Sequence, residues 1–254
     1  MSLFRLFACS AAVLATGVLV VGCGGSKNPA AQNTTPGGGG YLDVLGKGAG
    51  KAGETESANN LKQIGLALQN YHLGQGQFPG SAAITDEKGK PLLSWRVAIL
   101  PMIEQQVLYQ QFKLDEPWDS PNNKKLPDLM PKLFMDPRFQ KKEDKLSVTY
   151  YQGFTGDGGV LGWKDGASLE VITNANGTSN TFLIVEAGDP VPWTKPADLV
   201  HDLKKPLPPL GGPNRGDFLA LLCNSDVRKI PAKTDEKVLR CMIQWNNKEA
   251  FKLP

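Results

Sequence analysis

The side chains best suited to catalysis are few in this chain, and they do not form a catalytic motif. The chain has two histidines, His72 and His201. Neither lies in a pattern such as G-x-S-x-G or H-E-x-x-H, which would place a nucleophile beside a base or pair two zinc ligands. His72 ends an amphipathic pattern, so we expect a structural role, and His201 lies in a proline-rich loop, so we expect it at the surface. The sequence therefore predicts no catalytic residues and no enzyme activity.

Three carboxylates lie close together at Asp115, Glu116 and Asp119, and hard oxygen ligands of this kind can bind Ca²⁺. Their spacing is not that of an EF-hand, and the prolines at Pro117 and Pro121 indicate a turn-rich loop. A zinc site would need both histidines and two cysteines that have no recognisable spacing. We therefore predict no metal and no cofactor.

Tryptophan side chains offer a second kind of chemistry, because an aromatic face can stack on a sugar while a nearby carboxylate binds its hydroxyls. The candidate ligand-binding set is Trp118, Asp119, Trp163 and Trp193. The alternative is packing in the core or in loops. We favour packing, since Trp118 and Trp193 belong to proline-containing motifs typical of structural corners.

The first 22 residues have the layout of a secretory signal peptide, with one charge at Arg5 and an uncharged run from Leu6 to Val21. This run is shorter than the roughly 20 residues that cross a bilayer core. The sequence Val20-Val21-Gly22-Cys23 resembles the bacterial lipobox, in which the cysteine receives the lipid and begins the mature chain. We therefore predict lipidation of Cys23, with palmitate among the acyl chains; the alternative is an ordinary signal peptide with an incidental Cys23.

This anchor predicts an extracytoplasmic protein of the cell envelope, held on the membrane by lipid. Because Gly24 and not aspartate follows the cysteine, the expected location is the outer membrane, facing the periplasm. Residues 23–53 indicate the lipidated cysteine and a flexible glycine-rich tether, and residues 54–254 indicate one globular domain. The net charge of +3 is spread without a basic cluster, so nucleic acid is not an expected partner.

Two cysteines, Cys223 and Cys241, remain in the mature domain, because Cys9 leaves with the signal peptide. In an oxidising compartment they can form a disulfide, and the alternative is a pair of buried free thiols. The sequence leaves both outcomes open, and we name the pair as a candidate disulfide.

Apolar periodicity predicts helices first and strands later. Helices are expected over 57–72, capped by Ser57 or Thr55, over 94–100, where Ser94 can cap and Pro101 imposes a break, and over 102–112. Strands are expected over 148–154, 160–163, 181–187, 218–222 and 227–230, the last two as a hairpin, and a final helix is expected to start near Thr234. This order predicts an α+β fold with an antiparallel sheet.

Several blocks resemble a large bacterial family of unknown function that has prepilin-type N-termini and a C-terminal H-x9-DG box, and that some classifications place near solute-binding proteins. The blocks are NNLKQIGLALQNYH at Asn59 to His72, SWRVAILPMIEQQVLYQQFKLDEPWDSPNNKKL at Ser94 to Leu126, NGTSNTFLIVEA at Asn176 to Ala187 and VPWTKPADL at Val191 to Leu199. Members resemble pseudopilins, so the resemblance implies a pilin-like core: an N-terminal amphipathic helix packed on an antiparallel sheet, with extra helices between.

The chain departs from that family in two places. The lipobox and tether replace the hydrophobic prepilin segment, and Asn214 with Asn224-Ser225 stands where the H-x9-DG box would fall. We therefore expect a non-catalytic, lipid-anchored protein whose pilin-like domain acts as a binding or assembly surface for an unknown envelope protein or glycan. It should be a monomer or small oligomer and not a filament. The alternative function is an extracytoplasmic solute or glycan receptor.

Overall fold

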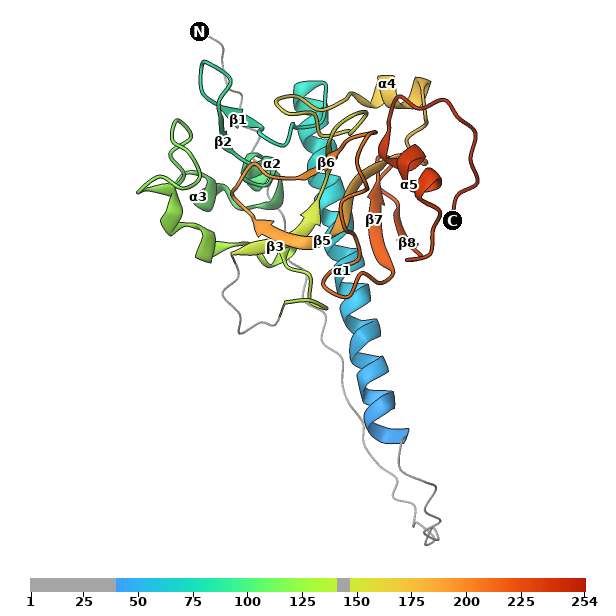
Figure 1. Ribbon diagram of the computed structural model, residues 1–254. Helices are drawn as coiled ribbons and strands as arrows, with labels where there is room; N and C mark the ends of the chain where they lie inside the picture. Colours follow the sequence, from blue (N-terminus) through green and yellow to red (C-terminus); the bar gives the residue numbers. More distant parts are fainter. Residues whose placement is uncertain (1–39, 141–146) are drawn as a thin grey trace, which may run out of the picture. The chain divides into compact units, whose positions relative to one another are not determined.

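Helix α1 (Gly40–Gln75) runs the length of the domain and extends past the sheet at its N-terminal end (Figure 1). Its side chains Leu61, Ile64 and Leu68 recur at helical spacing and are fully buried. The helix ends before Gly76, which adopts φ 78° in the left-handed region that favours glycine. The predicted amphipathic helix is thus present, and its apolar stripe faces the core.

The structure describes residues 40–140 and 147–254, with side chains from Gly50 onward. The predicted signal peptide and the first part of the predicted tether lie outside these ranges. The predicted helix start at Ser57 is wrong, because α1 begins at Gly40 and includes the last part of the expected tether. Once a helix is nucleated, each further residue adds a hydrogen bond at little extra cost. Within the described ranges, no helix has both the length and the apolar character to span a bilayer.

A four-stranded antiparallel sheet has the order β3-β5-β7-β8. Its strands are β3 (Val148–Gln152), β5 (Phe182–Pro192), β7 (Phe218–Leu222) and β8 (Val227–Ile230). The last two form the predicted hairpin with the predicted bounds, pairing Phe218 with Ile230 and Leu221 with Val227. The expected α+β class with an antiparallel sheet is confirmed.

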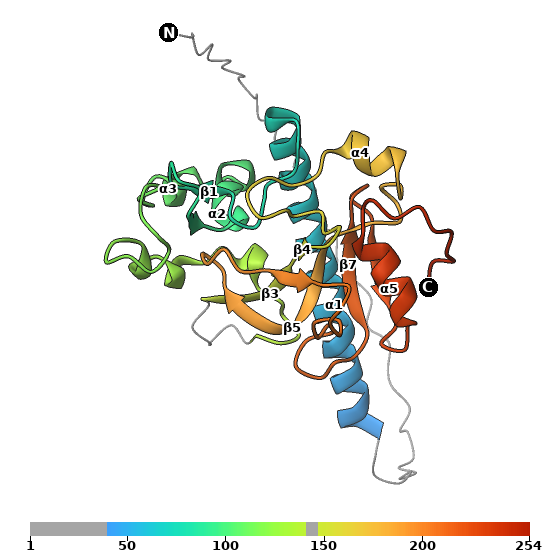
Figure 2. The same cartoon turned by 45° about the horizontal axis from the view of Figure 1, so that its top comes forward.

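The two faces of this sheet pack against different helices (Figure 2). Side chains alternate along β7, as the pleat requires: Leu219 and Leu221 join the core beneath α1, whereas Phe218 and Ala220 join a second core with Met242. Met242 belongs to α5 (Glu236–Ile243), which starts where the sequence indicates, with the Asp235 carboxylate accepting from the Lys237 amide. The sheet is therefore buried between α1 and α5.

Short elements connect α1 to the sheet and form the part of the domain beside α1 (Figure 1). They are β1 (Ile84–Thr85), β2 (Pro91–Leu93), α2 (Trp95–Ala98), η1 (Leu100–Ile103), α3 (Gln106–Tyr109), η2 (Asn123–Lys125), η3 (Pro127–Leu129) and η4 (Lys132–Phe134). The predicted break at Pro101 is present between α2 and α3. A continuous helix over 102–112 is wrong, because Glu104 adopts φ 60° and interrupts it. Ser94 precedes α2 but donates to the Trp193 carbonyl and does not cap the helix.

Three further elements complete the domain: β4 (Phe154–Gly156), α4 (Leu169–Asn174) and β6 (Leu199–His201). Strands β4 and β6 pair in parallel outside the main sheet. The predicted strand over 160–163 is wrong, since this segment forms turns. A Cβ added at Gly162 would lie only 2.1 Å from the carbonyl oxygen of Asp165, so the turn requires glycine at this position.

Candidate functional site

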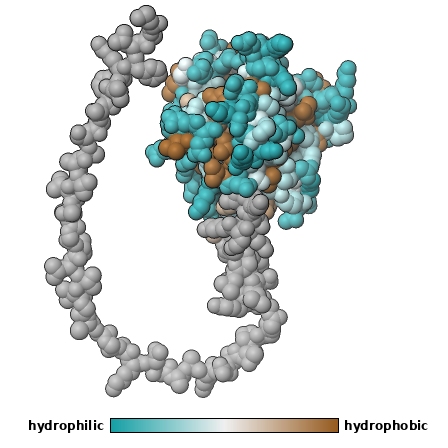
Figure 3. Space-filling view, turned by 90° about the vertical axis from the view of Figure 1, so that its left-hand side faces the viewer, coloured by the Kyte–Doolittle hydropathy of each residue, from teal (hydrophilic) through white to brown (hydrophobic). Residues whose placement is uncertain are grey.

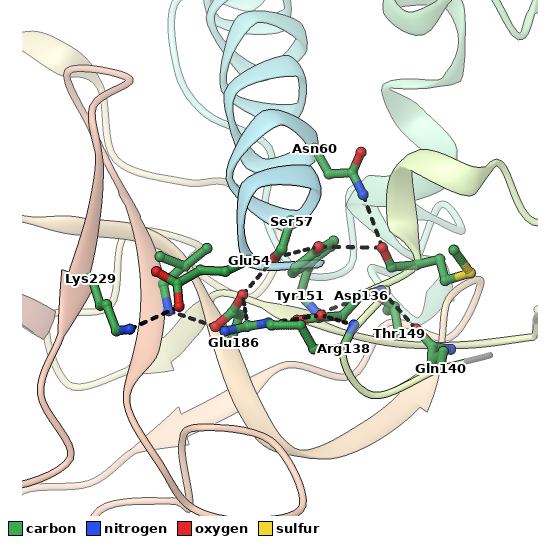
Figure 4. A network of polar contacts seen from close by, with 12 residues as sticks. Glu54, Ser57, Asn60, Asp136, Arg138, Gln140, Thr149, Tyr151, Glu186 and Lys229 are labelled. Atoms are coloured by element: carbon green, nitrogen blue, oxygen red, sulfur yellow. Dashed lines mark hydrogen bonds and ion pairs between the residues drawn. The ribbon is translucent and has the colours of Figure 1, made fainter. Parts of the chain in front are cut away.

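Glu186, on the central strand β5, is the buried acid at the junction between α1 and the sheet, and its side chain is fully shielded from solvent (Figure 4). Its Oε1 accepts a hydrogen bond of 2.6 Å from the Ser57 hydroxyl of α1. Its Oε2 accepts one of 2.6 Å from the Leu219 amide of β7. The guanidinium of Arg138 forms an ion pair with Oε1. One carboxylate therefore joins the helix, two strands and the segment before β3.

The same guanidinium also binds a second buried carboxylate, Asp136. Arg138 donates from Nη2 to Oδ2 at 3.0 Å and from Nε to Oδ1 at 3.2 Å. The Asp136 side chain is fully buried and that of Arg138 is 14% exposed. Two buried carboxylates thus share one largely buried cation, a group that we call the acid cluster (Asp136, Arg138 and Glu186).

The acid cluster contains two carboxylates and one guanidinium, and this imbalance of charge affects its proton binding. Burial and, to a smaller extent, the negative charge of Asp136 together raise the pKa of Glu186 to about 7, while the charge of Arg138 opposes the change. With both carboxylates ionised the cluster has a net charge of −1, which is costly in a low-dielectric site. One bound proton on Glu186 makes the cluster neutral.

A chain of hydroxyl groups leads from Glu186 to the backbone of Met135 (Figure 4). The Ser57 and Tyr151 hydroxyls lie 2.8 Å apart, and the Tyr151 hydroxyl donates to the Met135 carbonyl at 3.3 Å. Asn60, one turn along α1 from Ser57, donates to the same carbonyl at 3.0 Å. Burial holds the pKa of Tyr151 well above its usual range, so this phenol keeps its proton.

A second buried ion pair, Arg96 with Asp198, has matched charges. The two side chains are fully buried and lie 2.8 Å apart. Asp198 also accepts from the Ser81 hydroxyl at 2.6 Å and from the Gly153 amide at 3.0 Å, and Arg96 donates to the Tyr151 carbonyl. Because one cation meets one anion here, this pair has a structural role in joining α2 to β3.

An open groove of about 650 Å³ lies beside α1. One wall is an exposed face of the helix, where Leu66 is 63% exposed, and the other walls are η1 and η4. The groove is lined by Gln63, Leu66, Ala67, Asn70, Met102, Ile103, Glu104, Gln105, Pro131, Lys132 and Leu133. In Figure 3 apolar residues appear only as small groups among polar ones. The groove combines amide and aliphatic side chains with one acid, Glu104, and one base, Lys132, which suits a surface or polar solute without net charge.

Residues 52–133 match a family labelled SBP_bac_10 and described as a protein of unknown function (DUF1559). Over this segment, about a third of the chain, the sequence is similar to the DUF1559 family. The recognition of a bacterial family of unknown function from its sequence blocks is therefore confirmed. No curated protein and no solved structure matches the chain.

The DUF1559 segment contains every lining residue of the groove, from Gln63 to Leu133. The acid cluster lies just beyond it, at Asp136, Arg138 and Glu186. The groove is thus built by the family segment, and the cluster attaches that segment to the sheet.

The candidate ligand-binding residues have different surroundings. Trp193 is fully buried and packs against Phe134, with ring centroids 5.8 Å apart, so it cannot stack on a sugar. Trp118 is half-buried beneath Lys195. Trp163 is 53% exposed, in the loop before α4. For Trp193 the packing interpretation is therefore correct. Asp119 is exposed beside Trp118.

The two histidines have different surroundings. His72 accepts at Nε2 from the Leu169 amide at 3.0 Å, and this fits the expected structural role. The prediction that His201 lies at the surface is wrong, because it is 1% exposed on β6. Its Nε2 lies 3.2 Å from Nη1 of Arg240 and its Nδ1 2.5 Å from the Asp157 carbonyl. An arginine can only donate, so this contact assigns Nε2 of His201 as an acceptor and Nδ1 as the donor to the Asp157 carbonyl.

Cys223 and Cys241 are free, buried thiols in the structure, so the candidate disulfide is not formed. Cys223 belongs to the core beneath α1, whereas α5, which contains Cys241, packs on the opposite face of the sheet. Burial also raises the pKa of the Cys223 thiol, which makes it inert. The predicted lipidation site, Cys23, lies outside the described residues.

Sequence reasoning missed the acid cluster and the Arg96–Asp198 pair. A signal was present for two of these residues: Glu186 is the one charge in the apolar run from Phe182 to Ala187, and Arg96 interrupts another such run. A charge inside an apolar strand or helix must find a partner when it is buried. The identity of that partner depends on the fold and could not be read locally.

The acid cluster predicts a stability that depends on pH. Because the pKa of Glu186 is raised from 4.5 to about 7, the folded state holds a proton that the unfolded chain releases in this window. The contribution of Glu186 to the free energy of unfolding is therefore fully present below about pH 4.5, falls as the pH rises to about 7, and is lost above that pH. The expected loss is roughly 3 kcal/mol, measured by urea unfolding at several pH values from 5 to 8.

In Glu186→Gln this slope should be nearly absent, and the variant should match or exceed the wild type at pH 8. Glu54→Gln is the matched control, since it removes a carboxylate from the exposed pair with Lys229 and should retain the wild-type slope. Equal slopes in wild type and Glu186→Gln would contradict the assignment.

Proposed function

We propose that this protein is a non-catalytic, lipid-anchored protein of the cell envelope whose pilin-like domain uses the groove beside α1 as a binding or assembly surface. The observation that carries the proposal is that the DUF1559 segment supplies the whole groove. Helix α1 forms one wall of the groove and continues without interruption back to Gly40.

The chemistry of the described residues supports a binding role. Glu186, His201 and Cys223 are buried and are engaged in joining elements or packing the core. The groove instead presents aliphatic side chains beside the amides of Gln63 and Asn70. Surfaces of this composition bind through shape, dispersion and hydrogen bonds.

A solute or glycan receptor is the second candidate. The amide side chains in the groove favour it, since they can donate to and accept from hydroxyl groups, and the family label SBP_bac_10 is of the form used for solute-binding proteins. The buried position of Trp193 counts against the aromatic site first expected. Of the described residues that line the groove, none is aromatic, so we rank assembly above glycan binding.

The anchor also bears on oligomeric state. Pilin-type filaments depend on hydrophobic N-terminal helices that continue into the globular domain. Here the hydrophobic run ends at Cys23, and a glycine-rich sequence separates it from α1. We therefore propose an outer-membrane lipoprotein that faces the periplasm as a monomer or small oligomer and does not form a filament.

Lipidation is tested by metabolic labelling with an alkyne fatty acid in the cell of origin. The wild-type chain should become labelled and Cys23→Ser should not, because the lipid is attached through the Cys23 thiol. Several acyl chains at about 0.8 kcal/mol per buried methylene make such an anchor permanent. Equal labelling of both chains would refute the anchor.

The binding role of the groove is tested by site-specific photo-crosslinking in the intact cell. A photoreactive residue at Leu66, which is 63% exposed in the groove, should form a defined adduct. The same residue at Leu203 is the matched control, because it is a leucine of similar exposure, 56%, outside the groove. A protein adduct supports assembly and a glycan adduct supports the receptor. Identical adducts at both positions, or none at Leu66, would refute the proposal.

A further inference from the structure

We propose that the acid cluster is a proton-operated clamp, which fixes the η4 wall of the groove against α1 when one proton is bound and loosens it when that proton is released. The inference rests on the proposed binding role of the groove and adds its regulation. It follows from three observations: the chain continuity between wall and cluster, the number of protons that the hydroxyl chain needs, and the charge balance of the cluster.

The groove wall and the cluster are adjacent along the chain. Pro131 to Leu133 line the groove, η4 ends at Phe134, and Asp136 follows after a single residue. That residue, Met135, is the point of attachment, because its carbonyl accepts from Asn60 of α1 and from the Tyr151 hydroxyl. Any change in the hydrogen bonds at Met135 is therefore transmitted directly to the wall.

The hydroxyl chain contains three oxygen–oxygen contacts: Glu186 with Ser57, Ser57 with Tyr151, and Tyr151 with the Met135 carbonyl. Each contact needs one proton. When Glu186 is ionised, the two hydroxyls supply only two protons, so one contact lacks a hydrogen bond. When Glu186 is protonated it can donate to Ser57, Ser57 can donate to Tyr151, and Tyr151 can donate to Met135. The protonated cluster thus satisfies all three contacts.

The charge balance of the acid cluster also favours the protonated state. The two carboxylates and one guanidinium of the cluster become neutral when one proton is bound, and a neutral buried cluster avoids the cost of an unpaired charge. The described partners of the Asp136 carboxylate are all N–H groups of Arg138, which can only donate. The Glu186 carboxylate also contacts the Ser57 hydroxyl, which can accept a hydrogen bond from a protonated acid. Protonation at Glu186 is therefore compatible with its surroundings.

Other ionisable groups surround the cluster on every packed element. Glu54 on α1 pairs at the surface with Lys229 on β8 at 2.8 Å, and Asp217 lies 3.9 Å from the same lysine. Tyr151 on β3 keeps its proton because burial raises its pKa. These groups do not neutralise the buried cluster, because Lys229 is shared by two carboxylates, those of Glu54 and Asp217.

The clamp is tested on the full lipidated chain in detergent by hydrogen–deuterium exchange of peptides covering residues 131–140, at pH 6 and pH 8, corrected for intrinsic exchange. In the wild type, exchange in this segment should be about tenfold faster at pH 8, the factor that corresponds to one pKa unit. In Glu186→Gln, whose side chain is neutral at both pH values, the two rates should agree within about twofold.

Asp136→Asn is a second variant in case Glu186→Gln does not fold. It leaves one carboxylate for one guanidinium, so its pH difference should also disappear, while Glu54→Gln should behave as the wild type. A wild-type segment with equal exchange at both pH values, or a difference that persists in both cluster variants, would overturn the clamp. Exchange measures the clamp alone, whereas crosslinking at Leu66 measures the binding role, so the two proposals fail separately.

Discussion

One largely buried guanidinium, that of Arg138, binds two buried carboxylates and through them stabilises the junction between helix and sheet. An apolar stripe gives α1 its affinity for the sheet but does not fix its position along the strands, because hydrophobic contacts are not directional. Ser57 and Asn60 fix that position through directed hydrogen bonds. The groove depends on this placement, since α1 and η4 form two of its walls, and the junction involves the middle of α1 and the residues just after η4.

The large elements could be predicted because their signals extend over many residues. The spacing of Leu61, Ile64 and Leu68 indicates α1, and the bounds of β7 and β8 follow from two short β-rich runs on either side of a tight loop. The errors occur where one residue decides the outcome. Glu104 adopts a left-handed conformation that no periodicity reveals. The first turns of α1 have a glycine-rich sequence without an apolar periodicity that would indicate a helix.

The candidate site was less predictable, because its chemistry is created by contacts between distant segments. The sequence shows that Glu186 is a charge in an apolar strand, but its partner Arg138 lies in a separate segment before β3. His201 was expected at the surface because its loop is rich in proline, yet parallel pairing of β6 with β4 buries it. Trp193 similarly belongs to the core. Composition indicates which residues are unusual, and only the fold shows which of them meet.

The central claim is that Glu186 holds a proton near neutral pH because it is buried and shares one cation with a second acid. The most direct measurement is a carbon-13 carboxyl titration of the glutamate-labelled chain, with Glu186→Gln used to assign the resonance. One glutamate carboxyl should titrate at about pH 7 in the wild type, and this resonance should be absent from the variant. If every glutamate carboxyl instead titrates near the ordinary value of 4.5, the cluster carries its extra charge at neutral pH and the account is wrong.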